Sequence, residues 1–277
     1  MVVWSEALKI ERLTLAIANL PVSLSGIKLV QLSDFHYDGL RLSESELSEV
    51  IYLTNQEKPD IIFLTGDYVT DDPTPIHDLA ARLKTLDSKW GIYASLGNHD
   101  IHYRESSEMI TQALTKIGIR VLWNEIAYPF GDNFPIVGLA DYWSTEFNPA
   151  KVLTQLDHNV PRLVLSHNPD TAEILKPWRV DLQLSGHTHG GQIVLPGLGP
   201  APLVIQKLQS KTPSYVHPWI PFLQECKNVL KNWQWAQGWH QIQRNQLYVN
   251  RGLGTYFPGR LFCPPELTVI TLISQNE

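Results

Sequence analysis

Short apolar runs alternate with amphipathic helical segments along the first two thirds of this chain, and this alternation limits the possible fold more than any other feature. The runs Ile27–Leu32, Ile61–Leu64 and Ile92–Leu96 have the length and composition of buried strands. Between the first two runs, Ser43 and Glu46 have the spacing of a capping box, which predicts the start of a helix. Strands that alternate with helices predict a layered α/β domain in which helices cover the sheets.

The same pattern continues towards the C-terminus. The other expected strands are Leu13–Ile17, Ile119–Leu122, Ile136–Leu139, Leu163–Leu165, Leu182–Leu184, Leu247–Asn250 and Leu267–Leu272, and the other expected helices are Ile76–Leu86 and Ser107–Ile117. Prolines and glycines crowd Leu195–Pro221, so we expect mostly loop there. No repeat, low-complexity tract or linker interrupts the chain, which predicts a single domain over residues 1–277.

Composition excludes several classes of protein. Of the 277 residues, 43% are hydrophobic and 18% are charged, which describes a folded globular chain. The net charge of −6 lacks the basic footprint of a general nucleic-acid binder. With only Cys226 and Cys263, at most one disulfide can form. Neither a leader nor a membrane-spanning apolar run is evident, so we expect a cytoplasmic protein, with the inner face of the membrane as an alternative location.

Potential metal ligands directly follow five of the expected strands. These residues are Asp34 and His36, Asp67, the trio Asn98, His99 and Asp100, then His167, and finally His187 with His189. In open α/β sheets the carboxyl ends of the strands face one crevice, so we expect these side chains to meet. Carboxylate, imidazole and amide groups suit Mn, Fe, Zn or Mg, and this set exceeds the needs of one tetrahedral ion. The sequence therefore predicts two divalent metal ions.

These groups resemble the motifs of the calcineurin-like metallophosphoesterase family. The matching blocks, in the family's order, are Asp34-Phe35-His36, Gly66-Asp67, Gly97-Asn98-His99-Asp100, Ser166-His167 and Gly186-His187-Thr188-His189. A single short pair is common by chance, but five ordered blocks at strand ends are a specific signal. Three later blocks look like a bacterial branch that includes phosphodiesterases and a UDP-2,3-diacylglucosamine pyrophosphatase. They are Gly190-Gly191-Gln192, Asn250-Arg251-Gly252-Leu253-Gly254 and Cys263-Pro264-Pro265-Glu266.

The resemblance implies a four-layer α/β/β/α sandwich with a dinuclear metal site. It assigns Asp34, His36 and His189 to one ion, Asn98, His167 and His187 to the other, and Asp67 to both. Manganese is the expected metal, with Fe, Zn or Mg as alternatives. A hydroxide shared by the two ions would attack phosphorus. His99 would protonate the leaving oxygen, and Asp100 would orient the His99 imidazole, with helix capping as its alternative role.

Three further residues are candidates for substrate binding. The guanidinium groups of Arg251 and Arg260 suit phosphate oxygens, although a structural pair with Glu266 explains them nearly as well. His102 lies three residues after His99 and could touch the substrate.

Residues 203–244 form a basic, tryptophan-rich segment that is longer than we expect for this branch. Its tryptophans are Trp219, Trp233, Trp235 and Trp239. Apolar residues recur at helical spacing from Pro221 to Trp233, which predicts an amphipathic helix. Tryptophan and lysine on such a helix suit the headgroup region of an anionic bilayer. The alternative is a helix that packs its apolar face on the protein's own domain.

The sequence thus predicts a two-metal hydrolase that acts on a phosphodiester or a pyrophosphate, with a lipid-linked, UDP-2,3-diacylglucosamine-like substrate as one option. The alternatives are a phosphoprotein or small-molecule phosphomonoesterase and, from another class, a non-catalytic binding scaffold with the same fold. The scaffold is disfavoured because His99 and every expected ligand are present. The expected partner is a phosphorylated small molecule or lipid rather than nucleic acid, and peripheral membrane contact through residues 203–244 stays open.

Overall fold

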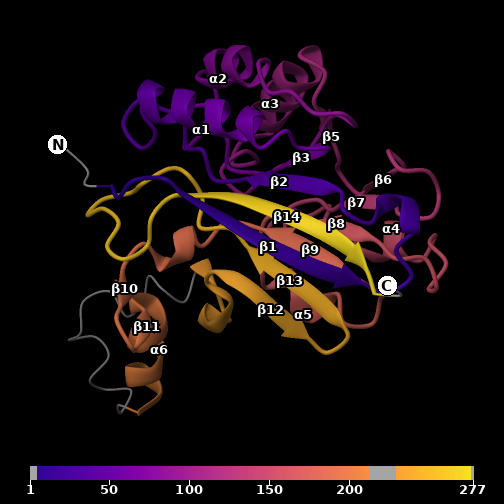
Figure 1. The fold of residues 1–277 in the computed structure, drawn as a ribbon. Coiled ribbons are helices and arrows are strands. Elements are labelled where there is room, and N and C mark those ends of the chain that lie inside the picture. The colour runs from indigo at the N-terminus through magenta and orange to yellow at the C-terminus, as the bar shows by residue number, and fades with distance from the viewer. Residues whose placement is uncertain (1–4, 212–228, 276–277) are drawn as a thin grey trace.

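Two six-stranded β-sheets lie at the centre of the structure (Figure 1). The computed structural model describes residues 5–211 and 229–275. The first sheet has the order β1-β14-β2-β3-β4-β5, with β1 Lys9–Ile17, β14 Glu266–Ser274, β2 Lys28–Leu32, β3 Ile61–Thr65, β4 Ile92–Ser95 and β5 Arg120–Val121. The second has the order β12-β13-β9-β8-β7-β6, with β12 Gly238–Ile242, β13 Asn245–Val249, β9 Leu182–Ser185, β8 Leu163–Leu165, β7 Ile136–Gly138 and β6 Glu125–Ala127.

The strands that lead to the predicted ligands are parallel within each sheet. In the first sheet β2 pairs with β3 and β3 with β4, both in parallel. In the second sheet β8 pairs with β9 in parallel as well. The carboxyl ends of neighbouring strands therefore lie at one edge of each sheet, where loops can build a site.

Helices cover the outer faces of both sheets. On the first sheet these are α1 (Glu44–Gln56), α2 (Ile76–Leu83) and α3 (Arg104–Lys116), and on the second they are the short helices α4 (Ala150–Leu153) and α5 (Thr171–Ile174). Ser43 and Glu46 form both bonds of the predicted capping box, so the start of α1 is confirmed.

The side chains of β3 show why the fold has four layers. Ile61 and Phe63 point into the apolar cluster between the sheets, where they pack with residues such as Leu184. Ile62 and Leu64 point the opposite way, into the cluster beneath the three helices of the first sheet. Because alternate residues of a strand face opposite sides, a strand that is apolar throughout must be covered on both faces. The predicted α/β sandwich is confirmed.

The structure differs from the sequence-based expectations mainly after residue 190. The expected loop at 195–221 contains helix α6 (Ala201–Lys211), which accommodates Pro202 because proline is tolerated in the first turn of a helix. The predicted helix Pro221–Trp233 lies mostly outside the described residues, and at its end the chain forms the 3₁₀ turn η4 (Trp233–Trp235). Strands β6 and β12 were not expected, because each is an edge strand with exposed residues.

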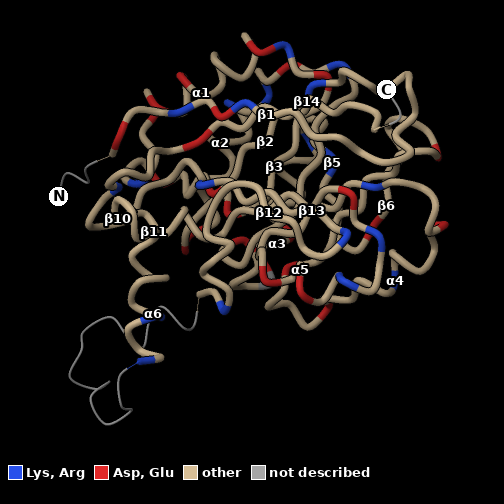
Figure 2. Tube along the Cα trace, turned by 60° about the horizontal axis from the view of Figure 1, so that its bottom comes forward, with Lys and Arg blue, Asp and Glu red and all other residues tan. Residues whose placement is uncertain are grey.

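Helix α6 and the small hairpin β10 (Val194–Leu195) with β11 (Gly199–Pro200) extend away from the two sheets (Figure 1). Helix α6 carries Lys207 and Lys211 and no acidic residue, and Figure 2 shows basic positions in blue along it. The chain returns from residue 229 to the edge of the second sheet, where the 3₁₀ turn η4 leads into β12. The segment therefore joins the main body beside the loop that follows β9.

Candidate metal centre

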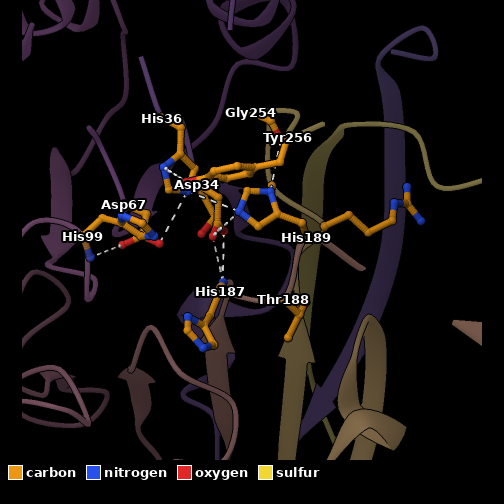
Figure 3. A network of polar contacts seen from close by, with 12 residues as sticks. Asp34, His36, Asp67, His99, His187, Thr188, His189, Gly254 and Tyr256 are labelled. Atoms are coloured by element: carbon orange, nitrogen blue, oxygen red, sulfur yellow. Dashed lines mark hydrogen bonds and ion pairs between the residues drawn. The ribbon is translucent and has the colours of Figure 1, made fainter. Parts of the chain in front are cut away.

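The predicted ligands gather at the carboxyl ends of five strands from both sheets (Figure 3). Their side-chain donor atoms form three groups, each with its members within 4.8 Å of one another. The groups are Asp34 with His36 and His189, then His36 with Asp67 and His99, and finally Asp67 with His167 and His187. Segments far apart in sequence thus converge as expected, and Asp67 belongs to two of the three groups.

The backbone in these loops adopts conformations that bring the ligands together. Asp34, His36, Asp67, His187 and His189 all have positive φ angles, between 43° and 72°. Such angles are uncommon for residues other than glycine, and they concentrate where a functional arrangement holds them. Two glycines serve a different purpose, because a Cβ at Gly97 would overlap the carboxylate of Asp67 and one at Gly186 would overlap that of Asp34.

The nitrogen and oxygen atoms of the ligands predicted for the first ion lie close together around one small space. His36 Nε2 lies 3.2 Å from His189 Nε2 and 3.5 Å from Asp67 Oδ2, and His189 Nε2 lies 3.6 Å from Asp34 Oδ1. Neighbouring ligands of an octahedral ion with bonds of 2.0–2.1 Å are about 3 Å apart. The spacing of these atoms therefore suits a common cation.

The ligands predicted for the second ion include two buried atoms without a hydrogen-bond partner, His167 Nε2 and Asn98 Oδ1. His167 Nε2 lies 3.1 Å from Asp67 Oδ2, the same oxygen that approaches His36. Leaving a buried polar atom unpaired costs about 1–3 kcal/mol, so two of them at one place call for a partner. A cation beside Asp67 would supply it, and the donor set fits such an ion.

Main-chain carbonyls fix which ring nitrogen faces the centre in four of the five histidines, all but His36. Nδ1 of His167 lies 2.6 Å from Thr65 O, Nδ1 of His189 lies 3.1 Å from Gly254 O, and Nδ1 of His99 lies 2.9 Å from Thr70 O. A carbonyl only accepts, so these nitrogens carry the hydrogen and Nε2 keeps its lone pair. His187 is reversed, because its Nε2 donates to Val229 O at 2.9 Å and Nδ1 is left for a ligand.

The electrostatics of Asp67, His187 and His189 favour the protonation states that metal ligands need, whereas burial raises the pKa of Asp34 and so disfavours its ionised form. Burial disfavours ionised Asp67, but the nearby His167 and His36 outweigh it and hold the pKa of Asp67 well below its usual value. Burial and the neighbouring His167 lower the pKa of His187 to about 4, and burial with His36 holds the pKa of His189 well below its usual value. Although burial opposes it, Asp67 raises the pKa of His167, so a cation there would replace the proton on that ring.

His99 lies at the cavity, where proton donation by it stays a prediction, and Asp100 does not contact its ring. The His99 ring meets His36 edge to face at 4.8 Å between centroids and lines the cavity above the ligands. The carboxylate of Asp100 instead accepts from the backbone amides of Asp67, Tyr68 and Gly97, at 2.7–2.8 Å. The prediction that Asp100 orients the imidazole is wrong, because the carbonyl of Thr70 does so. It does not cap α3 either, which starts at Arg104.

The two arginines predicted to bind phosphate make structural contacts. Arg260 is fully buried and donates to backbone carbonyls, including that of Gly254, which in turn holds His189. Arg251 pairs with Glu266 at 3.0 Å and with Glu11 at 2.9 Å. Neither is among the residues that line the cavity. Arg251 makes the structural pair with Glu266 that was the alternative, whereas Arg260 bonds to the backbone instead, and substrate binding by either residue stays a prediction.

A cavity of about 430 Å³ opens over the ligands. His102 lies on its wall, so substrate contact by this residue stays a prediction. Three residues that the sequence patterns did not indicate, Tyr256, Trp143 and Val229, line the same cavity. The hydroxyl of Tyr256 lies 2.9 Å from His36 Nδ1, on the side of the ring away from the ligand space. Its position two residues after the Asn250–Gly254 block was the one available signal, since that block was already associated with the site.

Within the described part of residues 203–244, the chain from Leu230 onwards packs on the domain itself, whereas α6 extends away from the sheets. Trp233 and Trp235 are buried, whereas Trp239 is 47% exposed. The two buried rings cannot form an apolar platform for a bilayer, because Trp233 packs with Leu230 and Trp235 packs with Leu247. Within residues 5–211 and 229–275, no helix combines the length and apolar character required to cross a membrane. Peripheral membrane contact through this segment stays a prediction.

The fold and its ligand groups define a class of proteins, the metal-dependent hydrolases of phosphoesters. The chain belongs to the calcineurin-like phosphoesterase family, whose profile matches residues 27–191. Phosphodiesterase YaeI of Escherichia coli K12 is 32% identical over 253 residues, covering 89% of this chain and 82% of its own. The uncharacterized metallophosphoesterase YkuE of Bacillus subtilis 168 is 33% identical over 263 residues, covering 93% of this chain and 82% of its own.

A third relative names a lipid-linked substrate. UDP-2,3-diacylglucosamine pyrophosphatase LpxG of Chlamydia muridarum is 28% identical over 311 aligned positions, covering 95% of this chain and 88% of its own. These relatives confirm the predicted family, its bacterial branch and the hydrolase class.

The contacts of Arg251 generate a prediction that separates its two possible roles. Arg251→Ala leaves the buried Glu266 carboxylate without its cationic partner and with only hydroxyl donors, so we expect the free energy of unfolding to fall by about 3 kcal/mol. The KM for a phosphoester should stay unchanged, because Arg251 does not line the cavity. Urea unfolding and steady-state kinetics measure the two effects. Arg12→Ala, which removes an exposed partner of Glu57, is the control and should cost at most about 1 kcal/mol. Unchanged stability with a raised KM would restore Arg251 to substrate binding.

Proposed function

We propose that this hydrolase uses two divalent ions to cleave a phosphodiester or a pyrophosphate. The observation that carries the proposal is that one oxygen, Asp67 Oδ2, lies within 3.5 Å of ligand atoms from both groups. One ion would be held by Asp34, His36 and His189 and the other by Asn98, His167 and His187, with Asp67 shared. Manganese fits the nitrogen and oxygen donors, as do Fe, Zn and Mg.

The chain's own residues can position the reaction and move a proton. Two ions held there would supply an activated water and neutralising charge for the phosphoryl oxygens. His99 keeps Nδ1 on the carbonyl of Thr70 and so directs Nε2 into the cavity, where its protonated form can donate to the leaving oxygen. Asp100 holds the amides of Asp67 and Gly97, which fixes the shared carboxylate between the two groups.

The walls of the cavity bear on the choice of substrate. Trp143 and Val229 are 49% and 37% exposed, and both line the cavity beside His187 and His102. An apolar wall next to the ligands suits a substrate with a large non-polar or aromatic group beside its phosphate. The names of YaeI and LpxG point to the same bond types, a phosphodiester and a lipid-linked pyrophosphate. A cytoplasmic location, at the inner face of the membrane, would suit a lipid-linked substrate.

A comparison of substrates tests this proposal against its alternatives. Purified protein loaded with Mn²⁺ should hydrolyse an aryl phosphodiester and a nucleotide-linked diacyl pyrophosphate faster than an aryl phosphomonoester or a phosphopeptide. Higher kcat/KM for the phosphomonoester would favour the phosphatase alternative. Metal binding without turnover of any of the four substrates would favour the binding scaffold.

The shared carboxylate predicts a combined loss of metal and activity. Asp67→Ala removes a ligand from both ions at once, so we expect little bound metal and no measurable turnover. Metal analysis of the purified variant and a hydrolysis assay provide the measurements. Asp72→Ala, which changes an exposed carboxylate that bonds only to Thr74, is the control and should keep both ions. Two ions and normal turnover in Asp67→Ala would refute the shared role.

The position of His99 predicts a loss of rate that depends on the leaving group. His99→Ala should retain both ions but lose about 10²- to 10⁴-fold in kcat for an alkoxide leaving group, which needs a proton. The loss should shrink for nitrophenolate, which leaves without one. His158→Ala changes a histidine whose side chain is 88% exposed and should leave both rates unchanged. Equal losses for the two leaving groups would contradict proton donation.

A further inference from the structure

The chain from Val229 to Ala236 runs along the loop that carries His187 and His189. The carbonyl of Val229 accepts from His187 Nε2 at 2.9 Å, and the carbonyl of Ala236 accepts from the hydroxyl of Thr188 at 2.5 Å. Val229 also lines the cavity. This stretch, which we call the returning segment (residues 229–236), therefore touches a candidate ligand with its backbone.

Asp170 holds the returning segment from the side of the second sheet. Its Oδ2 accepts from the amide of Lys231 at 2.7 Å, and its Oδ1 accepts from the amide of Asn232 at 3.1 Å and from Asn232 Nδ2 at 2.8 Å. The residue is 5% exposed, which strengthens these charge-assisted bonds. Every contact that the structure gives the Asp170 carboxylate is with Lys231 or Asn232, although the residue lies only three positions after His167.

Two other contacts hold the same segment from the side of α6. Leu230 is 1% exposed and packs with Trp233, Ala236 and Leu203. Gln206 on α6 donates from Nε2 to the carbonyl of Lys231 at 3.0 Å. The position of the Val229 carbonyl is therefore set from both sides.

The Val229 carbonyl determines how the His187 ring is presented. By accepting the Nε2 hydrogen, it leaves the Nδ1 lone pair for the ligand group with Asp67 and His167. Trp143 and His167 meet the ring edge to face, each at 5.1 Å between centroids, but neither contact selects a nitrogen. The other three candidate histidine ligands have their acceptors elsewhere, so only His187 depends on the returning segment.

We propose that Asp170 is a positioning residue for the second ion, acting through the returning segment and the Val229 carbonyl on the tautomer and orientation of His187. The proposal rests on the assignment of His187 as a ligand in the proposed function. Its consequence is that contacts outside the ligand set tune the affinity of one ion and leave the other unaffected.

Metal titration of two variants tests the proposal. Asp170→Ala and Leu230→Ala both release the returning segment, one from each side. Calorimetric titration of the metal-free proteins with Mn²⁺ should show two binding steps in the wild type. In each variant, one step should weaken by about 10- to 100-fold while the other is unchanged. Asp157→Ala removes a carboxylate that is 62% exposed and accepts from the amide of Asn159 rather than from the returning segment, and should retain both affinities.

A second readout does not require bound metal. In the metal-free protein, ¹⁵N NMR of the His187 imidazole should report the Nε2–H tautomer in the wild type and a mixture of tautomers in Asp170→Ala. A general loss of folding stability would not by itself shift the tautomer of this ring. Should either core variant fail to fold, Gln206→Ala removes the contact from α6 instead, and a smaller selective weakening of the same step is expected.

The outcomes separate this proposal from the proposed function. Fewer than two ions in the wild type would contradict the proposed function itself. Two ions in the wild type, with unchanged affinities and tautomer in folded Asp170→Ala, would overturn only the role of Asp170. Equal weakening of both steps would also overturn it, since the route through His187 affects one ion. A selective effect of Asp170→Ala with none from Leu230→Ala or Gln206→Ala would overturn the route through the returning segment.

Discussion

The carboxylate of Asp67 is the point on which the site depends. Its Oδ2 faces His36 from the first sheet and His167 from the second, while its Oδ1 accepts from the backbone amide of His99 at 3.0 Å. A buried carboxylate is costly unless positive or polar groups surround it. Here imidazoles and an amide do so, which holds the pKa of Asp67 low and keeps the group ionised. The two sheets must meet at this edge for that to happen, so the sandwich and the site require each other.

Much of the fold and the convergence of the ligands could be predicted because both follow from local patterns. Ile61–Leu64 is apolar at every position, which indicates a strand covered on both faces, and Asp67 comes directly after it. The order of such strand ends along the chain then placed the ligands at one edge. The resemblance to the family's motifs then assigned each ligand to one of the two ions.

The contacts of Asp100 and Arg260 could not be predicted, because they are made with distant backbone, whereas the pair of Arg251 with Glu266 was one of the two alternatives that the sequence offered. Asp100 binds amides 32 and 33 positions earlier in the chain, and nothing in its own neighbourhood indicates them. Arg260 is fully buried among carbonyls that come together only when the glycine-rich loop at 252–254 folds back. Helix α6 was missed for a different reason, since prolines mark loops and helix starts alike.

The orientation of four of the histidines, His99, His167, His187 and His189, is set by acceptors that belong to the main chain, whereas His36 meets the hydroxyl of Tyr256. The acceptors of the four are the carbonyl oxygens of Thr65, Thr70, Gly254 and Val229. A substitution at any of these positions replaces a side chain but leaves the acceptor in place, provided that the backbone keeps its path. The proton pattern of the site is thus insulated from most single-residue changes around it. Drift in sequence can reshape the cavity for new substrates while the chemistry at its floor stays the same.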